Sequence, residues 1–176
     1  LAELVRLRMF QKYGDAIYTS GMKVYTTLRV IDQKAAMSGV RLGILEFHRR
    51  RGYVGPEGQV KLPQDAKEAD KTIENTLLDR EESNGFLPGV VLAVDKNRIR
   101  VRLRSAEDID LGLSEIKFAE RFLSTKLAPE KRLGRGSIVR VARADASAPW
   151  QLTYLPQVEV AFVALDPANG AVRAMV

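Results

Sequence analysis

Polar and apolar residues alternate strictly along residues 98–104. Ile, Val and Leu separate four arginines, which are Arg98, Arg100, Arg102 and Arg104. Successive side chains of a β-strand point to opposite faces, so the pattern predicts a half-buried strand whose polar face is basic. An apolar run, Gly89–Val94, comes before it, and the residues between them, Asp95-Lys96-Asn97, favour a turn. We therefore predict a β-hairpin within residues 87–104.

Further short apolar segments follow this hairpin and predict additional strands. Strands are expected over residues 137–143, 150–155 and 158–165, with Pro156 interrupting the last two. An Asn-Gly pair before residue 171 predicts a closing hairpin with residues 171–176. Because the first hairpin must cover its apolar face, we predict that it joins the segments near residues 138–141 and 150–155 in a small antiparallel barrel.

Helical spacing of apolar residues appears in three places. Residues 1–13 predict a short helix, and residues 65–82 predict an amphipathic helix with seven acidic and three basic residues. Ala36, Val40, Ile44 and Phe47 mark a third helix, which we expect Asp32 to cap and Gly52 to end.

The segments between these helices and strands carry weaker patterns. Residues 21–31 are rich in β-branched and aromatic residues, which predicts a strand. Residues 52–63 and 105–110 have the composition of loops. Residues 111–123 are compatible with a short strand followed by a helical turn.

Composition and charge narrow the classes of partner and chemistry. The formal net charge of +6 favours anionic partners, and the absence of cysteine excludes disulfides and thiolate metal sites. No apolar run approaches the roughly 20 residues that span a bilayer. The chain starts without Met and stops inside an apolar run, which we interpret as a piece of a longer protein.

Three stretches carry a resemblance to a known family. They are TSGMKVYTTLRVIDQKAA near the start, RRRGYVGPEG at the end of the helix that Gly52 closes, and VEVAFVALDPANGAVRAMV at the end. In these stretches and their order, the chain resembles class A penicillin-binding proteins of the 1A type, the bifunctional peptidoglycan synthases of Gram-negative bacteria.

The resemblance implies an α+β, mainly β organisation. Residues 1–20 would be an interdomain linker helix, and residues 21–63 the first strand and helix of a transpeptidase domain. Residues 64–156 would be an inserted OB-like antiparallel barrel with its preceding acidic helix, and residues 157–176 the returning transpeptidase strands. In that family, residues 23–31 and 158–176 would share one sheet.

The resemblance also implies where catalysis takes place. The family's transpeptidase uses Ser-x-x-Lys with two companion motifs, Ser-x-Asn and Lys-Thr-Gly or Lys-Ser-Gly. The formal matches here begin at Ser20 and Ser114, but neither has the expected context and no companion motif is present. We therefore expect no catalytic residue, cofactor or metal ligand in this segment, although the parent would be a glycosyltransferase and transpeptidase.

The resemblance further implies a place in the cell and a partner. The segment would lie on the periplasmic side of the inner membrane, attached through an anchor outside this sequence. An outer-membrane lipoprotein activator and the rest of the synthase chain are the partners it implies. We interpret the segment as a regulatory or docking element of the synthase.

The arginine row of residues 98–104 is the candidate site for that docking, since guanidinium groups bind carboxylates in a bidentate way. A second interpretation is a structural spacer whose charged strand only prevents unwanted strand pairing. A third is polyanion binding, because residues 85–156 hold 13 basic and 8 acidic residues. The row contains no aromatic residue for base stacking, so nucleic acid is not the expected partner.

Other candidate groups have ordinary explanations. His48 stands beside three arginines, which disfavour a metal cation, so a packing or surface role is expected. Glu107, Asp108 and Asp110 lack the spacing of a calcium loop. Gly134 and Gly136 are interpreted as turn glycines, because a phosphate-binding loop requires Gly-Lys-Ser/Thr.

Overall fold

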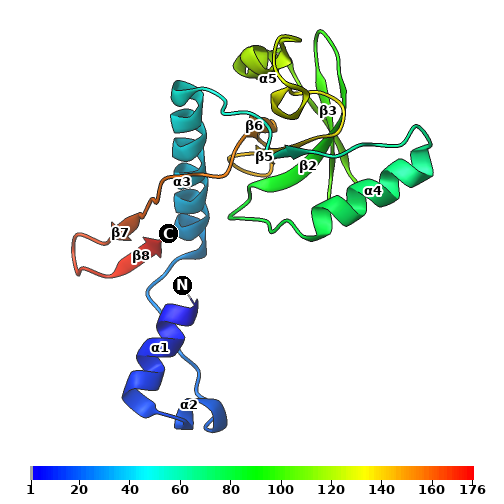
Figure 1. Cartoon of the computed structure of the whole chain (residues 1–176). Coiled ribbons are helices and arrows are strands. Elements are labelled where there is room, and N and C mark those ends of the chain that lie inside the picture. Colours follow the sequence, from blue (N-terminus) through cyan, green and yellow to red (C-terminus); the bar gives the residue numbers. More distant parts are fainter. Residues whose placement is uncertain (1) are drawn as a thin grey trace. The chain divides into compact units, whose positions relative to one another are not determined.

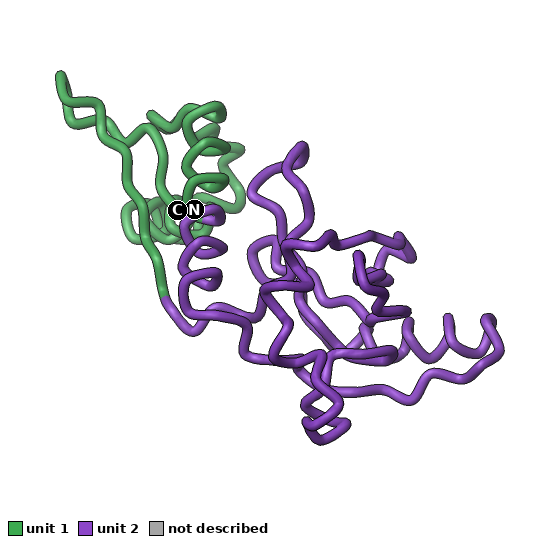
Figure 2. The backbone as a smooth tube through the Cα atoms, turned by 90° about the horizontal axis from the view of Figure 1, so that it is seen from above, with its two compact units in different colours: residues 1–40, 159–176 green, residues 41–158 purple. Residues whose placement is uncertain are grey.

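The computed structural model describes residues 2–176 and divides into two compact units (Figure 2). Unit 1 comprises residues 1–40 and 159–176, and unit 2 comprises residues 41–158. The boundary between them falls within one helix, α3 (Val30–Arg51). The chain therefore enters unit 2 and returns to unit 1 after it.

Unit 1 contains two short helices, the start of α3 and a hairpin (Figure 1). Helix α1 is Ala2–Tyr13 and α2 is Ala16–Thr19. The first helix was predicted, although Leu1 lies outside the described residues. Strands β7 (Val163–Leu165) and β8 (Val172–Met175) pair antiparallel, as the Asn-Gly signal predicted. Gly170 in their turn has φ +69°, which glycine adopts without strain.

The strand predicted over residues 21–31 is absent from the structure. Isolated hydrogen bonds join this segment to β8. The Arg29 N–H donates to the Arg173 carbonyl at 3.0 Å, the Thr27 hydroxyl to the Val172 carbonyl at 2.7 Å, and the Arg173 Nη1 to the Thr27 carbonyl at 3.4 Å. Val30, one of the β-branched residues behind the prediction, instead begins α3. Asp32 therefore lies inside the first helical turn, where it pairs with Arg29 at 3.4 Å, and the predicted cap is wrong.

Unit 2 is built on a six-stranded antiparallel sheet (Figure 1). Its strands are β1 (Gly58–Gln59), β2 (Leu87–Val94), β3 (Ile99–Leu103), β4 (Asp108–Leu111), β5 (Ser137–Ala142) and β6 (Gln151–Thr153). The order is β1-β5-β2-β3-β4, and β6 also pairs with β5. Strands β1 and β6 share one edge of β5, at its beginning and its end.

The predicted barrel is not closed by strand pairing in residues 2–176. Closure requires each strand to have a neighbour on both sides, whereas β4 pairs only with β3. The predicted hairpin of β2 and β3 is confirmed, with a bulge between Val91 and Ala93. The predicted strands β5 and β6 are also present, but β1 lies in a segment predicted to be loop.

Helix α4 (Ala66–Leu78) covers part of one face of the sheet. Ile73 and Leu77 pack there against Val90 of β2 and Ile138 of β5. The acidic helix predicted over residues 65–82 is thus confirmed, but it ends earlier. Its N-cap is Asp65, whose carboxylate accepts a hydrogen bond from the Glu68 N–H at 3.0 Å.

The opposite face holds the larger apolar core. Val91, Val101, Ile109 and Val139 belong to this core, and α5 (Leu113–Ala119) contributes Ala119. Two short 3₁₀ turns follow, Glu120–Leu123 and Pro129–Lys131. Residues 108–110 were predicted to be loop, yet they form most of β4, since the alternate residues Ile109 and Leu111 enter the core.

Candidate docking face

Strand β3 positions the arginine row as the alternating pattern predicted. Ile99 and Val101 are fully buried on the core face, while the arginines point to the other face. We call the side chains of Arg98, Arg100, Arg102 and Arg104 the arginine face. The side chains of Arg98 and Arg100 are 49% and 40% exposed, so both are accessible to a partner. Arg104 lies just beyond the end of β3.

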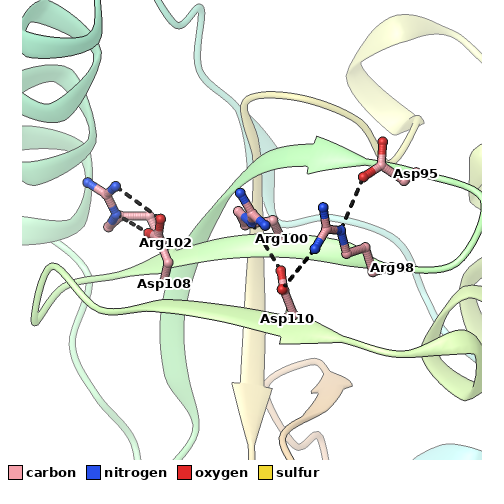
Figure 3. Close-up of polar contacts among 6 residues, drawn as sticks. All are labelled: Asp95, Arg98, Arg100, Arg102, Asp108 and Asp110. Carbon is pink, nitrogen blue, oxygen red and sulfur yellow. Dashed lines mark hydrogen bonds and ion pairs between the residues drawn. The ribbon is translucent and has the colours of Figure 1, made fainter.

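Aspartates from neighbouring segments pair with the first two arginines (Figure 3). Asp110 of β4 accepts from Arg100 at 3.1 Å and from Arg98 at 3.4 Å. Asp95, in the turn before β3, accepts from Arg98 at 3.3 Å. The hydrogen bond from Arg100 lowers the pKa of Asp110, so this carboxylate remains charged at neutral pH.

Arg102 has a more structural role than its neighbours. Its guanidinium binds Asp108 of β4 through both Nε and Nη2, and its Nη1 donates to Asp70 of α4 at 2.7 Å. Only 21% of the side chain is exposed. Arg102 therefore links the helix that covers this face to the edge of the sheet.

Arg104 makes no ion pair with any residue of 2–176. It lines a cavity of about 300 Å³ between α4 and the turn after β3, together with Asp70 and Glu74 of the helix. The four arginines are thus not equivalent. Arg98 and Arg100 are exposed and paired with aspartates, Arg102 joins α4 to β4, and Arg104 is unpaired within residues 2–176. A ligand would meet alternating charges here rather than a uniform basic strip.

The sequence interpretation missed the acidic partners of the arginine face. The polar and acidic composition of residues 105–110 predicts a loop, whereas most of β4 lies there. The signal that could have identified them is the alternation Asp108-Ile109-Asp110-Leu111, which has the period of a strand. Asp70 is 32 residues before Arg102, and no local pattern predicts such a pair.

The other candidate side chains make contacts within the chain. His48 is buried, so it is a packing residue, and its ring stacks on Tyr154 with centroids 3.8 Å apart. Ser20 donates to the Ala16 carbonyl at 2.5 Å, and Ser114 donates to the buried Glu115 at 3.1 Å. Across residues 2–176 there is no cluster of three potential metal-ligating side chains.

The same described part of the chain contains no helix that is both long and apolar enough to cross a membrane.

Gly136 lies in a turn, as predicted. Its φ is +87°, and its N–H donates to the Val91 carbonyl at 2.8 Å.

Comparison with known proteins adds independent information. The family "Penicillin-binding protein OB-like domain" matches residues 53–158. Penicillin-binding protein 1A of Neisseria lactamica is 33% identical over the whole chain, and that of Pseudomonas aeruginosa is 32% identical. The chain spans 22% and 21% of those relatives, about a fifth of their length.

A solved structure of a penicillin-binding protein also matches this chain. The crystal structure of penicillin-binding protein 1A from Haemophilus influenzae superposes with a TM-score of 0.74 and 27% sequence identity. The match covers 99% of this chain and 25% of that protein. The likeness therefore extends over both units of the chain.

Proposed function

Since the chain belongs to the penicillin-binding proteins of the 1A type and carries their OB-like domain, we propose that it is a non-catalytic docking segment of a peptidoglycan synthase. The whole synthase would be a bifunctional glycosyltransferase and transpeptidase on the periplasmic side of the inner membrane. Its partner would be an outer-membrane lipoprotein that activates it. This segment would transmit the effect of that partner without carrying out chemistry.

The arginine face is the observation that carries the proposal. Arg98, Arg100 and Asp110 form ion pairs that are largely exposed, and exposed pairs contribute little to stability. A partner carboxylate can therefore replace Asp110 on either guanidinium at small cost. Arg104 needs no such exchange, because it has no acidic partner among residues 2–176.

Charge reversal of the exposed arginines tests the proposal. The variant R98E/R100E/R104E leaves Arg102 in place, because that residue links α4 to the sheet. Its matched control, K117E/K126E/K131E, changes the net charge equally at exposed lysines of the same unit. Each chain is used to capture proteins from a Gram-negative envelope extract, after circular dichroism has verified folding.

The expected result is a lipoprotein retained by the unchanged chain and by the lysine control, and lost from the arginine variant. Equal retention by all three chains would show that the arginine face is not the docking surface. If none of them retains a partner at low salt, the docking function is wrong and the spacer interpretation replaces it.

The spacer is supported by a specific observation of its own. Three of the four arginines have acidic partners within the chain, as residues of a purely solvated face would. Polyanion binding is less well supported, because a phosphate chain would meet Asp108 and Asp110 between the arginines. It would require retention to fall steeply with salt and to be independent of the partner's identity.

A further inference from the structure

Strand β4 is an edge strand with an unused row of backbone groups. It pairs antiparallel with β3, with Arg102 opposite Asp108 and Arg100 opposite Asp110. On the other side of β4 no strand is paired within residues 2–176. Such an edge presents free N–H and C=O groups to any extended segment that approaches it.

The register identifies which groups are free. The Leu103 N–H donates to the Glu107 carbonyl at 2.8 Å, so this opposed pair is a hydrogen-bonded one. Opposed pairs alternate between bonded and non-bonded along an antiparallel ladder. The pairs of Asp108 and Asp110 are therefore non-bonded, and the N–H and C=O groups of both residues point away from β3. None of these four groups makes a hydrogen bond in the described chain.

The edge is fixed in place and accessible. Ile109 and Leu111 are 5% and 0% exposed, so the apolar side of β4 is anchored in the core. The side chains of Asp108 and Asp110 are 40% and 46% exposed and lie on the arginine face (Figure 3). An added strand would thus meet a rigid template rather than a loop that must first be ordered.

The charges of the two strands define the side chains of an added strand. On the arginine face β3 is basic and β4 is acidic. Arg100 lies directly opposite Asp110, and Arg102 directly opposite Asp108. A further strand would place its side chains directly opposite these aspartates, at about 5 Å between Cβ atoms, where opposite charges stabilise and like charges destabilise. The complementary segment therefore carries Lys or Arg at every second position.

We propose that β4 accepts an extended segment of a protein partner by strand addition, with basic side chains opposite Asp108 and Asp110. Backbone hydrogen bonds would supply affinity, and the two carboxylates would select the charge and register of the segment. The inference rests on the proposed docking function and adds a second contact to it: the partner that presents carboxylates to the exposed arginines would also provide a basic segment at the edge of β4. The opposite interpretation is that the two aspartates protect the edge from pairing, in which case a basic peptide would not slow amide exchange at Asp108 and Asp110.

Two variants at one position separate backbone pairing from charge. Both D110A and D110P remove the carboxylate, but only D110P also removes the outward N–H. Proline is tolerated in edge strands where the N–H faces solvent, so the ladder with β3 should persist in D110P. The nitrogen-15 spectrum of each whole chain verifies that unit 2 remains folded.

The probe is an acetylated and amidated hexapeptide of alternating lysine and valine. Its control carries the same charges but is N-methylated at the backbone of each lysine, the positions that would pair with Asp108 and Asp110. With the unchanged chain, we expect the unmodified peptide to slow amide exchange at Asp108 and Asp110 and to bind more tightly than its control. We expect D110P to bind it about three- to tenfold more weakly than D110A, the loss typical of one hydrogen bond.

Strand addition is overturned if the N-methylated peptide binds as well as the unmodified one, or if exchange at the two amides does not change with the peptide at saturation. This test also remains informative if D110P fails to fold, because it uses the unchanged chain. If R98E/R100E/R104E loses the lipoprotein but the unchanged chain binds the N-methylated and unmodified peptides equally well, the docking function stands and only strand addition is rejected. If R98E/R100E/R104E keeps the lipoprotein and the two peptides also bind equally well, both proposals are rejected.

Discussion

At the scale of single residues, we expect His48 to make the stability of unit 2 depend on pH. The ring is 2% exposed, its Nδ1 lies 2.6 Å from the Thr153 hydroxyl, and its Nε2 has no partner in the described structure. Phe47, Phe86 and Tyr154 surround it, and Arg51 is the charged group near Tyr154. Burial therefore lowers the pKa of His48, because the imidazolium would be desolvated without an acceptor for Nε2.

A lowered pKa means that the folded state binds fewer protons than the unfolded state. The contribution of His48 to the free energy of unfolding should be fully present above the unfolded-state pKa of about 6.5. It should decrease as the pH falls from there to the lower pKa of the folded state. Denaturant unfolding at a series of pH values between about 5 and 8, roughly one and a half units either side of that pKa, measures this. In H48F the decrease over this window should be smaller, and an unchanged profile would assign the dependence to other groups.

Two glycines in one turn offer a matched pair of substitutions. Gly136 has φ +87°, and a Cβ there would lie 2.1 Å from the Val60 carbonyl oxygen. Gly134 has nothing within 4 Å of its Cβ position. We expect G136A to reduce the free energy of unfolding by about 2–5 kcal/mol, from backbone strain and overpacking together. G134A should change it by less than about 1 kcal/mol, and equal effects of the two would contradict the close approach of Gly136 to Val60.

Residue-level prediction from the sequence succeeded where the information was local. The alternation around Arg100 correctly indicated which face each side chain of β3 would occupy. The ion pairs were not predictable in that way, because Asp110 comes from the next strand and Asp70 from an earlier helix. The burial of His48 likewise depends on Tyr154, which is more than 100 residues away in the sequence.

At the scale of elements, α4 should contribute to unit 2 mainly through its apolar side. Ile73 is 2% exposed and packs against Val90 and Ile138, whereas Glu74 is exposed. I73A should lower the free energy of unfolding by about 3 kcal/mol, since it removes buried methylene and methyl groups and leaves a cavity. E74A should change it by about 0.5 kcal/mol or less. Similar effects of the two would mean that α4 is not docked on the sheet.

Elements with strong periodicity or a clear turn signal were predictable, whereas β1 and β4 were not. The acidic helix has a buried residue at every fourth position, Ala69, Ile73 and Leu77, and the hairpin of β2 and β3 has both alternation and a turn. Strand β1 has two residues, too few for a period. The four residues of β4 do alternate, but they follow a polar, acidic stretch that favours a loop. Residues 21–31 have the composition of a strand, but composition does not provide the neighbouring strand that a ladder requires.

At the scale of the whole molecule, the sequence predicted the type of domain but not whether its sheet closes. Apolar segments indicate how many strands share a core, and the predicted group of β2, β3, β5 and β6 is present in one sheet. Closure depends on whether the last strand reaches a second neighbour, which is a matter of shear and tilt rather than of pattern. The free edge of β4 is therefore a property that only the structure reveals.

The division into two units predicts that residues 41–158 fold by themselves. Unit 2 contains the whole sheet, both sides of its core and the buried residues Leu45 and His48 of α3. In unit 1, by contrast, a few hydrogen bonds join residues 1–40 to residues 159–176, among them two between Gln33 and Met175 of 2.7 and 2.9 Å. Among the described residues of unit 1, the buried apolar ones are Ala36 and Ala174. Most of the apolar burial that resists unfolding thus lies in unit 2.

We therefore expect a chain of residues 41–158 to unfold cooperatively, with a Tm within about 4 °C of the main transition of the whole chain, a shift of less than roughly 1 kcal/mol. Differential scanning calorimetry of both chains measures this, and Q33A in the whole chain serves as the control. Because Q33A removes only contacts within unit 1, it should leave the main transition unchanged. A broad, non-cooperative transition in residues 41–158 would show that unit 2 requires the flanking segments to fold.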